Sequence, residues 1–268
     1  MADLDAVADV LTRGFPDRPR KYWTTALARL GALGLPEGCP RYGYVLEADG
    51  SIVGVQLLIF AEVDGRVRCN VSSWYVEPEH RGHAALLASM ASKLKHVTYL
   101  NTSAATHTWP ILGALGYRRY SEGQFACVPA LAGGQGRTRR LGQGHVDTNL
   151  PEAGLLRQHR EAGCLVLVHE PDGAPEPFVF LERRVAGLPF AAMQLIYARD
   201  TQRFVANAGP IGRFLLRRGA PVVICDASAP IAGLPGVWFR RRGARYFKGP
   251  EAPRVNDLAF TEMVVLGP

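Results

Sequence analysis

One joint between a strand and a helix has residue types that suit phosphate binding. It lies in the stretch WYVEPEHRGHAALLASMASKL, residues 74–94, where Pro78 ends a strand and a helix begins near Ala84. The first amides of a helix lack partners and carry partial positive charge, which attracts anions. Gly82 lets the backbone approach a ligand closely, and Arg81 can add a charge-assisted hydrogen bond. These residue types suit a phosphate-binding loop at Arg81-Gly82, although ordinary strand-to-helix turns also use Arg-Gly.

Other side chains near this joint could take part in chemistry. His80 and His83 flank the loop and could contact a phosphate or act as a base, although solvated loop histidines are the more common case. Glu62 and Glu77 are candidates for a base that deprotonates an amine. Each is expected at the end of a strand, where solvated carboxylates are common. The sequence therefore assigns no catalytic residue.

The cysteines and histidines do not suggest a metal site. Five cysteines, an odd number, are widely spaced and include no Cys-x-x-Cys pair. This argues against a disulfide framework and against structural zinc. No Cys or second carboxylate at ligand spacing accompanies His80 and His83. We therefore expect no metal, and we interpret most of the cysteines as small core residues.

The elements that must position the joint follow from the first half of the chain. Residues 3–15 place apolar side chains on one helical face. Two β-rich runs flank Asp49-Gly50, a dipeptide suited to a tight hairpin turn, and a turn at Asp64-Gly65 leads into a third run. This predicts an antiparallel meander. The elements expected after it are a helix over 84–94, a strand over 97–103, a short helix over 108–116 and a strand over 117–129.

Beyond residue 131 the order of elements partly repeats. Residues 132–150 are glycine-rich without apolar periodicity, which predicts a linker. The elements expected next are a helix over 153–162, strands over 164–170 and 177–185 around a turn at Asp172-Gly173, a strand over 190–198, a helix from Asp200-Thr201 and a strand over 221–227. The sequence thus predicts an α/β (α+β) chain of two domains, 1–131 and 151–268. Each is expected to be a mixed, mostly antiparallel sheet flanked by helices.

The first half resembles the Gcn5-related N-acetyltransferase (GNAT) superfamily over about residues 3–130. The family's pattern is a strand ending in Val-x-Pro, two further residues, and Arg-Gly-x-Gly-x-Gly/Ala opening a long helix. This chain has VEPEHRGHAAL at residues 76–86, and its later ILGALGY, residues 111–117, also matches. The resemblance implies an acyl-CoA co-substrate, acetyl-CoA or another acyl-CoA. The cofactor-binding residues that it implies are Tyr75, Val76, Arg81, Gly82, His83, Ala84, Ala85 and Leu86.

The chain departs from the family pattern at several positions. The second and third glycines of the loop fall on Ala84 and Leu86, and the Tyr that often protonates the leaving thiolate falls on Leu112. The second half resembles a degenerate GNAT-like copy. Its corresponding joint, 197–201, lacks glycine, and Gly209-Pro210 should interrupt the helix that follows. We therefore expect the second half to bind no cofactor.

Aromatic residues near the joint have two interpretations. Trp74 and Tyr75 occupy opposite faces of the strand, so core packing is the simpler interpretation of both. The alternative, implied by the resemblance, is that the backbone of Tyr75 or Val76 pairs with a pantetheine arm. His107 and Trp109 could line an acceptor pocket near the start of the short helix.

Composition limits the cellular setting and the partners. Hydrophobic residues make up 47% and charged residues 21%, which are ordinary values for a globular protein. No uncharged apolar run approaches the ~18 residues of a membrane span, and the acidic N-terminus does not resemble a signal peptide. We therefore expect a cytoplasmic protein without a membrane partner. Residues 131–268 hold 18 of the 31 basic side chains, which could attract a phosphorylated ligand or nucleic acid.

The function that these features favour is acyl-CoA-dependent acyl transfer, with N-acetyl transfer as the first expectation. The acceptor would be a small-molecule or peptide amine. Proximity of thioester and amine, plus a base, can suffice without a covalent intermediate. One alternative is an aminoacyl-tRNA-dependent transferase of the same fold, so tRNA stays open although nucleic acid is disfavoured. The other is a non-catalytic GNAT-fold protein, which Leu86 and Leu112 favour. Acceptor, acyl chain length and oligomeric state are not determined by the sequence.

Overall fold

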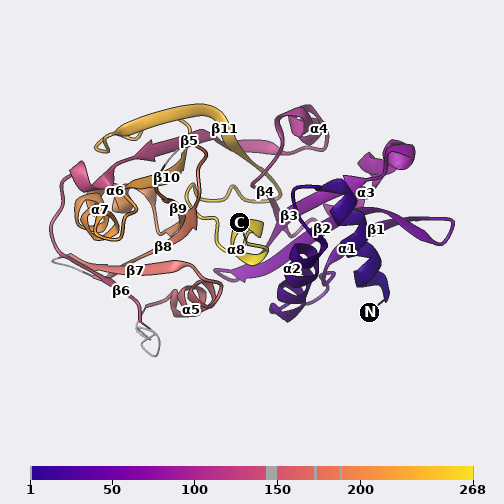
Figure 1. Cartoon of the computed structure of the whole chain (residues 1–268), viewed down its shortest axis with the longest axis horizontal. Coiled ribbons are helices and arrows are strands. Elements are labelled where there is room, and N and C mark those ends of the chain that lie inside the picture. The colour runs from indigo at the N-terminus through magenta and orange to yellow at the C-terminus, as the bar shows by residue number, and fades with distance from the viewer. Residues whose placement is uncertain (1, 143–149, 172–173, 188, 268) are drawn as a thin grey trace. The chain divides into compact units, whose positions relative to one another are not determined.

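A computed structural model describes residues 2–142, 150–171, 174–187 and 189–267. The predicted turn at Asp172-Gly173 and residues 143–149 of the predicted linker lie outside the described residues. The chain forms two compact units. Unit 1 comprises Met1–Arg118, Tyr246–Ala252 and Phe260–Pro268, and unit 2 comprises Arg119–Arg245 and Pro253–Ala259. The predicted α/β fold class is confirmed (Figure 1).

Unit 1 begins with helices α1 (Ala2–Gly14) and α2 (Arg20–Ala32). Their apolar faces form one cluster with β2 side chains that include Leu57 and Ile59. The sequence analysis predicted α1 but missed α2. A helix start is usually marked by a capping Ser, Thr, Asp or Asn. The residue before α2 is Pro19, whose side chain makes no capping hydrogen bond.

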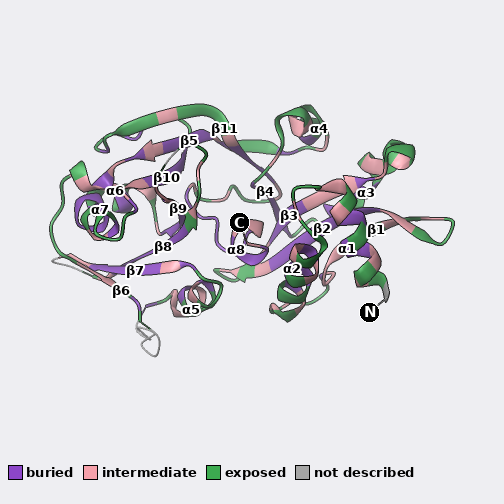
Figure 2. Ribbon diagram, viewed as in Figure 1, coloured by how far each residue is buried: buried purple, intermediate pink, exposed green. Residues whose placement is uncertain are grey.

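The predicted meander of unit 1 is confirmed. β1 (Gly43–Ala48), β2 (Ser51–Val63) and β3 (Arg66–Val76) pair in antiparallel order. Asp49 and Gly50 both have positive φ, as tight hairpin turns of the predicted kind require. The centre of β2 is buried on both faces (Figure 2). The meander is therefore the platform that carries the joint.

A parallel strand and the end of a late strand complete the unit 1 sheet. β4 (Thr98–Asn101) pairs parallel to β3. On the other side of β4, residues Tyr246 to Lys248 of β11 (Gly236–Lys248) pair antiparallel. The helical elements of this unit are η1 (Pro78–His83), α3 (Ala84–Ala91), η2 (Thr106–Thr108), α4 (Trp109–Ala114) and α8 (Glu262–Val265). The predicted helix over 84–94 is therefore three residues too long.

Unit 2 has the same order of strands: a meander followed by a parallel strand. Its strand order is β11-β5-β10-β9-β8-β7-β6, with β9 and β10 parallel. Its strands besides β11 are β5 (Arg118–Cys127), β6 (Arg137–Arg140), β7 (Leu165–Glu170), β8 (Glu176–Arg183), β9 (Ala192–Ala198) and β10 (Val222–Ala227). Its helices are η3 (Pro129–Leu131), α5 (Ala153–Glu161), α6 (Thr201–Ala206) and α7 (Ala208–Leu216). The predicted helix interruption is confirmed, although it falls at Asn207, before Gly209-Pro210.

The units are drawn from interleaved stretches of chain. Residues 119–131 belong to unit 2 because β5 pairs with β10, and the end of β11 belongs to unit 1 because it pairs with β4. Part of the predicted linker is a strand, β6, which pairs with β7 through an edge of Arg and Thr residues. Residues 137–140 of the predicted linker therefore form a strand. The division into domains 1–131 and 151–268 stays a prediction.

Candidate functional site

The predicted phosphate-binding joint follows β3 in unit 1 and is open to solvent. The sequence predicted a short loop, but η1 occupies Pro78–His83 and α3 starts directly after it. Arg81, Gly82 and His83 are exposed. Ala84 is partly buried, Ala85 is exposed, and the side chain of Leu86 is 58% exposed. An anion could therefore reach the guanidinium of Arg81 without any rearrangement of the core.

The 3-10 helix uses some amides that the sequence analysis expected to be available. The amide of His80 donates to the carbonyl of Glu77 at 2.9 Å, and the amide of Ala84 donates to the carbonyl of Arg81. Pro78 favours this tight winding because its ring fixes φ at a helical value. The expectation of an open loop is thus corrected. A phosphate that uses the amide of Ala84 has to open the last turn of η1.

Gly82 does not need the conformational freedom of glycine to fold. Its φ lies outside the positive range, and a Cβ placed on it would meet no atom within 4 Å. A side chain here would project into open space. The fold therefore does not require glycine at position 82. The absence of a side chain leaves room for a ligand to approach the backbone.

Tyr75 and Glu77 tie the end of β3 to α1. The guanidinium of Arg13 donates to Glu77 at 2.7 Å, and the Tyr75 hydroxyl donates to the same carboxylate at 2.9 Å. Burial acts to raise the pKa of Glu77, but the bonds from Arg13 and Tyr75 lower that pKa overall. Burial, together with the bond to Glu77, raises the pKa of Tyr75. Glu77 is thus held as an ion-paired carboxylate, which disfavours it as a base.

β3 and β4 pair over only three positions and then separate. The last pair is Asn70 with Leu100, while β3 continues to Val76. No strand of the described chain pairs with this side of β3 beyond Asn70. Ser73 has φ 47° and is the extra residue of a β-bulge against β2. Bulges with strained backbone are frequent beside functional sites.

The side chain of Trp74 leaves a polar atom unused beside this edge. Within the described residues, its indole Nε1 is buried and has no hydrogen-bond partner. A buried donor without a partner is destabilising and is uncommon in native proteins. A ligand that supplies an acceptor along β3 would satisfy it.

A polar cluster lies where β3 and β4 separate. Asn70, Ser72 and Thr102 are buried, with 3% exposure or less. The hydroxyl of Ser72 donates to one carboxylate oxygen of Glu262, and that of Thr102 donates to the other at 3.3 Å. The amide of Glu262 donates to Oδ1 of Asn70 at 2.5 Å. Glu262 therefore links β3 to the segment after β4.

Other residues singled out from the sequence lie away from the joint. Glu62 pairs with Val67 at the opposite end of β3, roughly 30 Å along the strand from Val76 at ~3.3 Å per residue. His107 is exposed, and the indole of Trp109 donates to the carbonyl of Ala104 at 3.2 Å. The position at which the family often has a tyrosine hydroxyl as general acid is Leu112 here. Its side chain is buried and has no hydroxyl.

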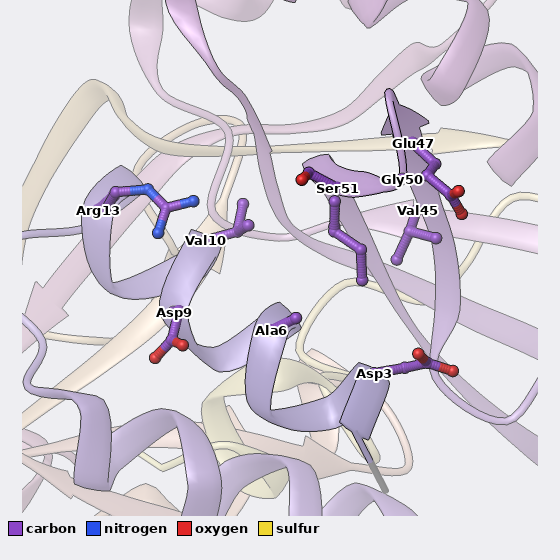
Figure 3. Close-up of a pocket in the computed structure, with 10 residues that line it drawn as sticks. Asp3, Ala6, Asp9, Val10, Arg13, Val45, Glu47, Gly50 and Ser51 are labelled. Carbon is purple, nitrogen blue, oxygen red and sulfur yellow. The ribbon is translucent and has the colours of Figure 1, made fainter.

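An open hollow of about 690 Å³ lies between α1 and the β1–β2 hairpin (Figure 3). Asp3, Asp9, Arg13 and Glu47 are among the residues that line it, and the carboxylate of Asp9 is ion-paired with Arg20 at 2.6 Å. It includes none of the predicted cofactor residues. Its acidic lining suits a cationic amine better than a phosphate, because opposite charges attract and like charges repel.

The corresponding joint in unit 2 is occupied by groups of the chain itself. Asp200 caps α6 by accepting from the amide of Gln202 at 2.5 Å, so a carboxylate already holds the helix start. The guanidinium of Arg199 donates to the two carboxylate oxygens of Glu152 at 2.6 Å and 2.9 Å. The edge of β9 beyond its pairing with β10 is bonded by backbone of residues 256–258. These features oppose phosphate binding here, and the expectation of no cofactor stays a prediction.

Comparison with known proteins places the fold. No protein-family model and no curated protein matches the sequence. A GCN5-related N-acetyltransferase from Anabaena variabilis matches 90% of this chain and 68% of its own, with a TM-score of 0.56 and 10% identity. A candidate acetyltransferase from Pyrococcus horikoshii matches 97% and 90%, with a TM-score of 0.53 and 12% identity. The chain has the GNAT fold. A conserved protein from Enterococcus faecalis gives a TM-score of 0.54 at 11% identity over 96% and 71%.

The cofactor-binding residues expected from the family resemblance lie together in unit 1. The predicted residues 75–76 and 81–86 form one continuous end of β3, η1 and α3, and their role in cofactor binding stays a prediction. Among the described residues no group of three or more His, Cys, Asp or Glu could hold a metal ion. None of the helices in the described ranges has the length and hydropathy needed to cross a membrane.

The sequence analysis missed the polar cluster and the bulge. The signal for Asn70 and Ser72 is present, because polar residues alternate with apolar ones in RCNVSSWYV. Buried polar groups in a strand need partners. Their partner could not be found, because Glu262 lies 190 residues from Ser72 in the chain.

Proposed function

We propose that this GNAT-fold chain is an acyl-CoA-dependent acyltransferase that moves an acyl group, in the first instance acetyl, to a primary amine. One observation carries the proposal. β3 separates from β4 after Asn70 and continues as an edge to Val76, and the exposed Arg81 follows in η1, between the end of β3 and α3. A strand edge for an amide-containing arm is therefore followed directly in the chain by a cationic segment for a pyrophosphate.

Within the proposal the ligand lies along β3. Its pyrophosphate is held by Arg81 and by amides at the start of α3. Its pantetheine arm, which contains two amides, pairs with the backbone near Tyr75 and Val76 as an added strand would. The indole Nε1 of Trp74 supplies a buried donor beside this path.

The chemistry needs no covalent bond to the protein. The amine nitrogen attacks the thioester carbonyl, the carbon–sulfur bond breaks, and a proton of the amine passes to a base while the thiolate of CoA leaves. Holding both reactants together contributes much of the acceleration. The acidic hollow beside α1 is suited to attract the ammonium form of the acceptor. The base is not assigned, since Glu62 is distant and Glu77 is ion-paired.

Two observations favour the alternative functions named above. Arg240, Arg241 and Arg242 are exposed on β11 next to Phe239, which is 41% exposed. Basic and aromatic groups together favour nucleic acid, and hence the aminoacyl-tRNA-dependent alternative. The buried Leu112 favours the non-catalytic alternative.

The test is a thermal-shift panel with CoA, acetyl-CoA, longer acyl-CoAs and tRNA. A ligand at 100 times its Kd stabilises the fold by ~2.7 kcal/mol. We expect a shift with CoA and acetyl-CoA, followed by release of free CoA when primary amines are added to acetyl-CoA. A shift with tRNA alone would favour the first alternative. No shift with any CoA species at millimolar concentration would contradict the proposal.

A further inference from the structure

The polar cluster of Asn70, Ser72, Thr102 and Glu262 closes the separation of β3 and β4 at its narrow end. The carboxylate of Glu262 accepts from Ser72 on β3 and from Thr102 just after β4. Asn70 donates to the carbonyl of Leu100, within the last pair of the two strands, at 3.1 Å. Both strands are therefore joined by side chains directly beyond their last backbone pairing.

The cluster faces the same side of the sheet as the core beneath α1 and α2. Asn70 pairs with Ile59 across the strands, and Ser72 pairs with Leu57. Cross-strand partners share a face of a sheet. Ile59 and Leu57 belong to the α1 and α2 core. Val265 and Leu266, which follow Glu262, pack into the same core and hold α8 in place.

The cluster lies in the direction in which the acyl end of a bound thioester would point. Asn70 and Val76 are roughly 20 Å apart along β3, at ~3.3 Å per residue. A donor whose pyrophosphate lies at Arg81 and whose arm follows β3 points its acyl group toward Asn70. This step rests on the proposed function. A long acyl group then reaches the carboxylate and hydroxyls of the cluster.

We infer that this cluster selects short acyl groups, and that Glu262 is the main specificity-determining residue. An acetyl group ends one methyl beyond the carbonyl and can stop before the cluster. A chain of eight carbons has to pass between Ser72 and Thr102, which Glu262 bridges. Its methylenes would separate the carboxylate from both hydroxyls and leave buried polar groups unpaired, which is strongly unfavourable.

The test compares the affinities of CoA, acetyl-CoA and octanoyl-CoA by isothermal titration. The wild type is expected to bind octanoyl-CoA at least about tenfold more weakly than acetyl-CoA, or ~1.4 kcal/mol. Glu262→Ala removes the bridge and should reduce this ratio to about threefold or less. Ser72→Ala removes one bond to the carboxylate and should reduce the ratio in the same direction. Glu62→Ala, which removes an exposed carboxylate on β2 opposite the start of β3, should leave the ratio unchanged.

The outcomes separate this inference from the proposed function. If the wild type binds octanoyl-CoA as tightly as acetyl-CoA, the inference is overturned while the proposed function stands. An unchanged ratio in folded Glu262→Ala and Ser72→Ala also overturns it. If the wild type binds neither CoA nor any acyl-CoA, the proposed function fails and this inference falls with it. Circular dichroism and thermal unfolding establish that each variant is folded.

Discussion

Arg81 is an exposed cation in η1, just before α3, and its contribution to ligand binding can be measured without disturbing the core. Arg81→Ala removes one charge-assisted hydrogen bond to the pyrophosphate, typically worth ~1.5–3 kcal/mol. Affinity for acetyl-CoA should therefore fall by about ten- to a hundredfold. Isothermal titration measures this change in affinity. Arg66→Ala, an exposed arginine at the other end of β3, is the matched control and should bind as the wild type does.

Gly82 gives a second and independent test, because it tolerates a side chain in the fold. Its φ is not positive and the space around it is open, so Gly82→Val should leave thermal stability nearly unchanged. The same side chain would block the approach of a phosphate to the backbone, and affinity should fall by about tenfold or more. Gly154→Val, at an open glycine in α5, controls for the added bulk. Unchanged affinity in folded Arg81→Ala and Gly82→Val would mean that the joint is only a turn.

Single residues also show where sequence reasoning reaches its limit. The polar, solvent-facing character of the residues around Arg81 could be predicted, because local residue types determine it. The 3-10 winding of η1 could not, since a proline followed by polar residues fits a loop equally well. Glu262 could not be assigned either. Its importance comes from hydroxyls on two strands that are far from it in the chain.

At the scale of elements, Glu152 ties the start of α5 to the end of β9 in unit 2. Its carboxylate accepts two bonds from Arg199 and one from the Tyr197 hydroxyl. Burial acts to raise the pKa of Glu152, but these bonds lower that pKa overall. A carboxyl whose pKa is lower in the folded state stabilises the fold at neutral pH. That contribution is lost as the pH falls through the lowered pKa.

Glu152→Gln should therefore destabilise the protein by roughly 1–2 kcal/mol at neutral pH. The difference from wild type should shrink as the pH falls below about 4.3, the ordinary range of glutamate. Urea unfolding at several pH values between neutral and acidic measures it. Glu161→Gln, an exposed carboxylate at the end of α5, is the control. A difference that stays constant with pH would show that the ion pair does not carry this stability.

Elements with strong local signals were predicted well. α1 has a clear apolar stripe, and the Asp-Gly turns fix the meander of β1, β2 and β3. Elements without such signals were missed or misplaced. α2 lacks a capping residue, and β6 is an edge strand of arginines. β11 ends in RRRGARYFK, whose strand character depends on its pairing with β4 and β5.

At the scale of the whole molecule, the unit to which each C-terminal segment belongs does not follow from its order in the sequence. Residues 253–259 belong to unit 2 and residues 260–268 to unit 1. In unit 2 the backbone of residues 256–258 bonds to β9 where β9 and β10 have separated. In unit 1 the side chain of Glu262 bridges the separation of β3 and β4, and β3 retains an edge without a paired strand among the described residues.

This difference predicts how many CoA molecules the chain binds. The edge of β9 is already used by Ile196 and Ala198, which bond to Leu258 and Asn256. The amide and carbonyl groups that a pantetheine arm needs are thus occupied in unit 2. We therefore expect one acetyl-CoA per chain by isothermal titration. Affinity in the Arg81→Ala/Gly82→Val double variant should fall at least as far as in either single variant, and no second, unaffected binding event should be seen.

Asn256 tests whether the segment in unit 2 is structural. It is fully buried with φ 63°, accepts from the amide of Asp226 at 2.7 Å and donates to Thr201 at 2.9 Å. Asn256→Ala leaves these groups unpaired and places alanine in a left-handed conformation, so stability should fall by about 1–3 kcal/mol. The count of bound acetyl-CoA should stay at one, because the backbone of the segment still covers β9. A second binding event in a folded Asn256→Ala variant would show that unit 2 retains a competent site, and the assignment of the single site to unit 1 would be wrong.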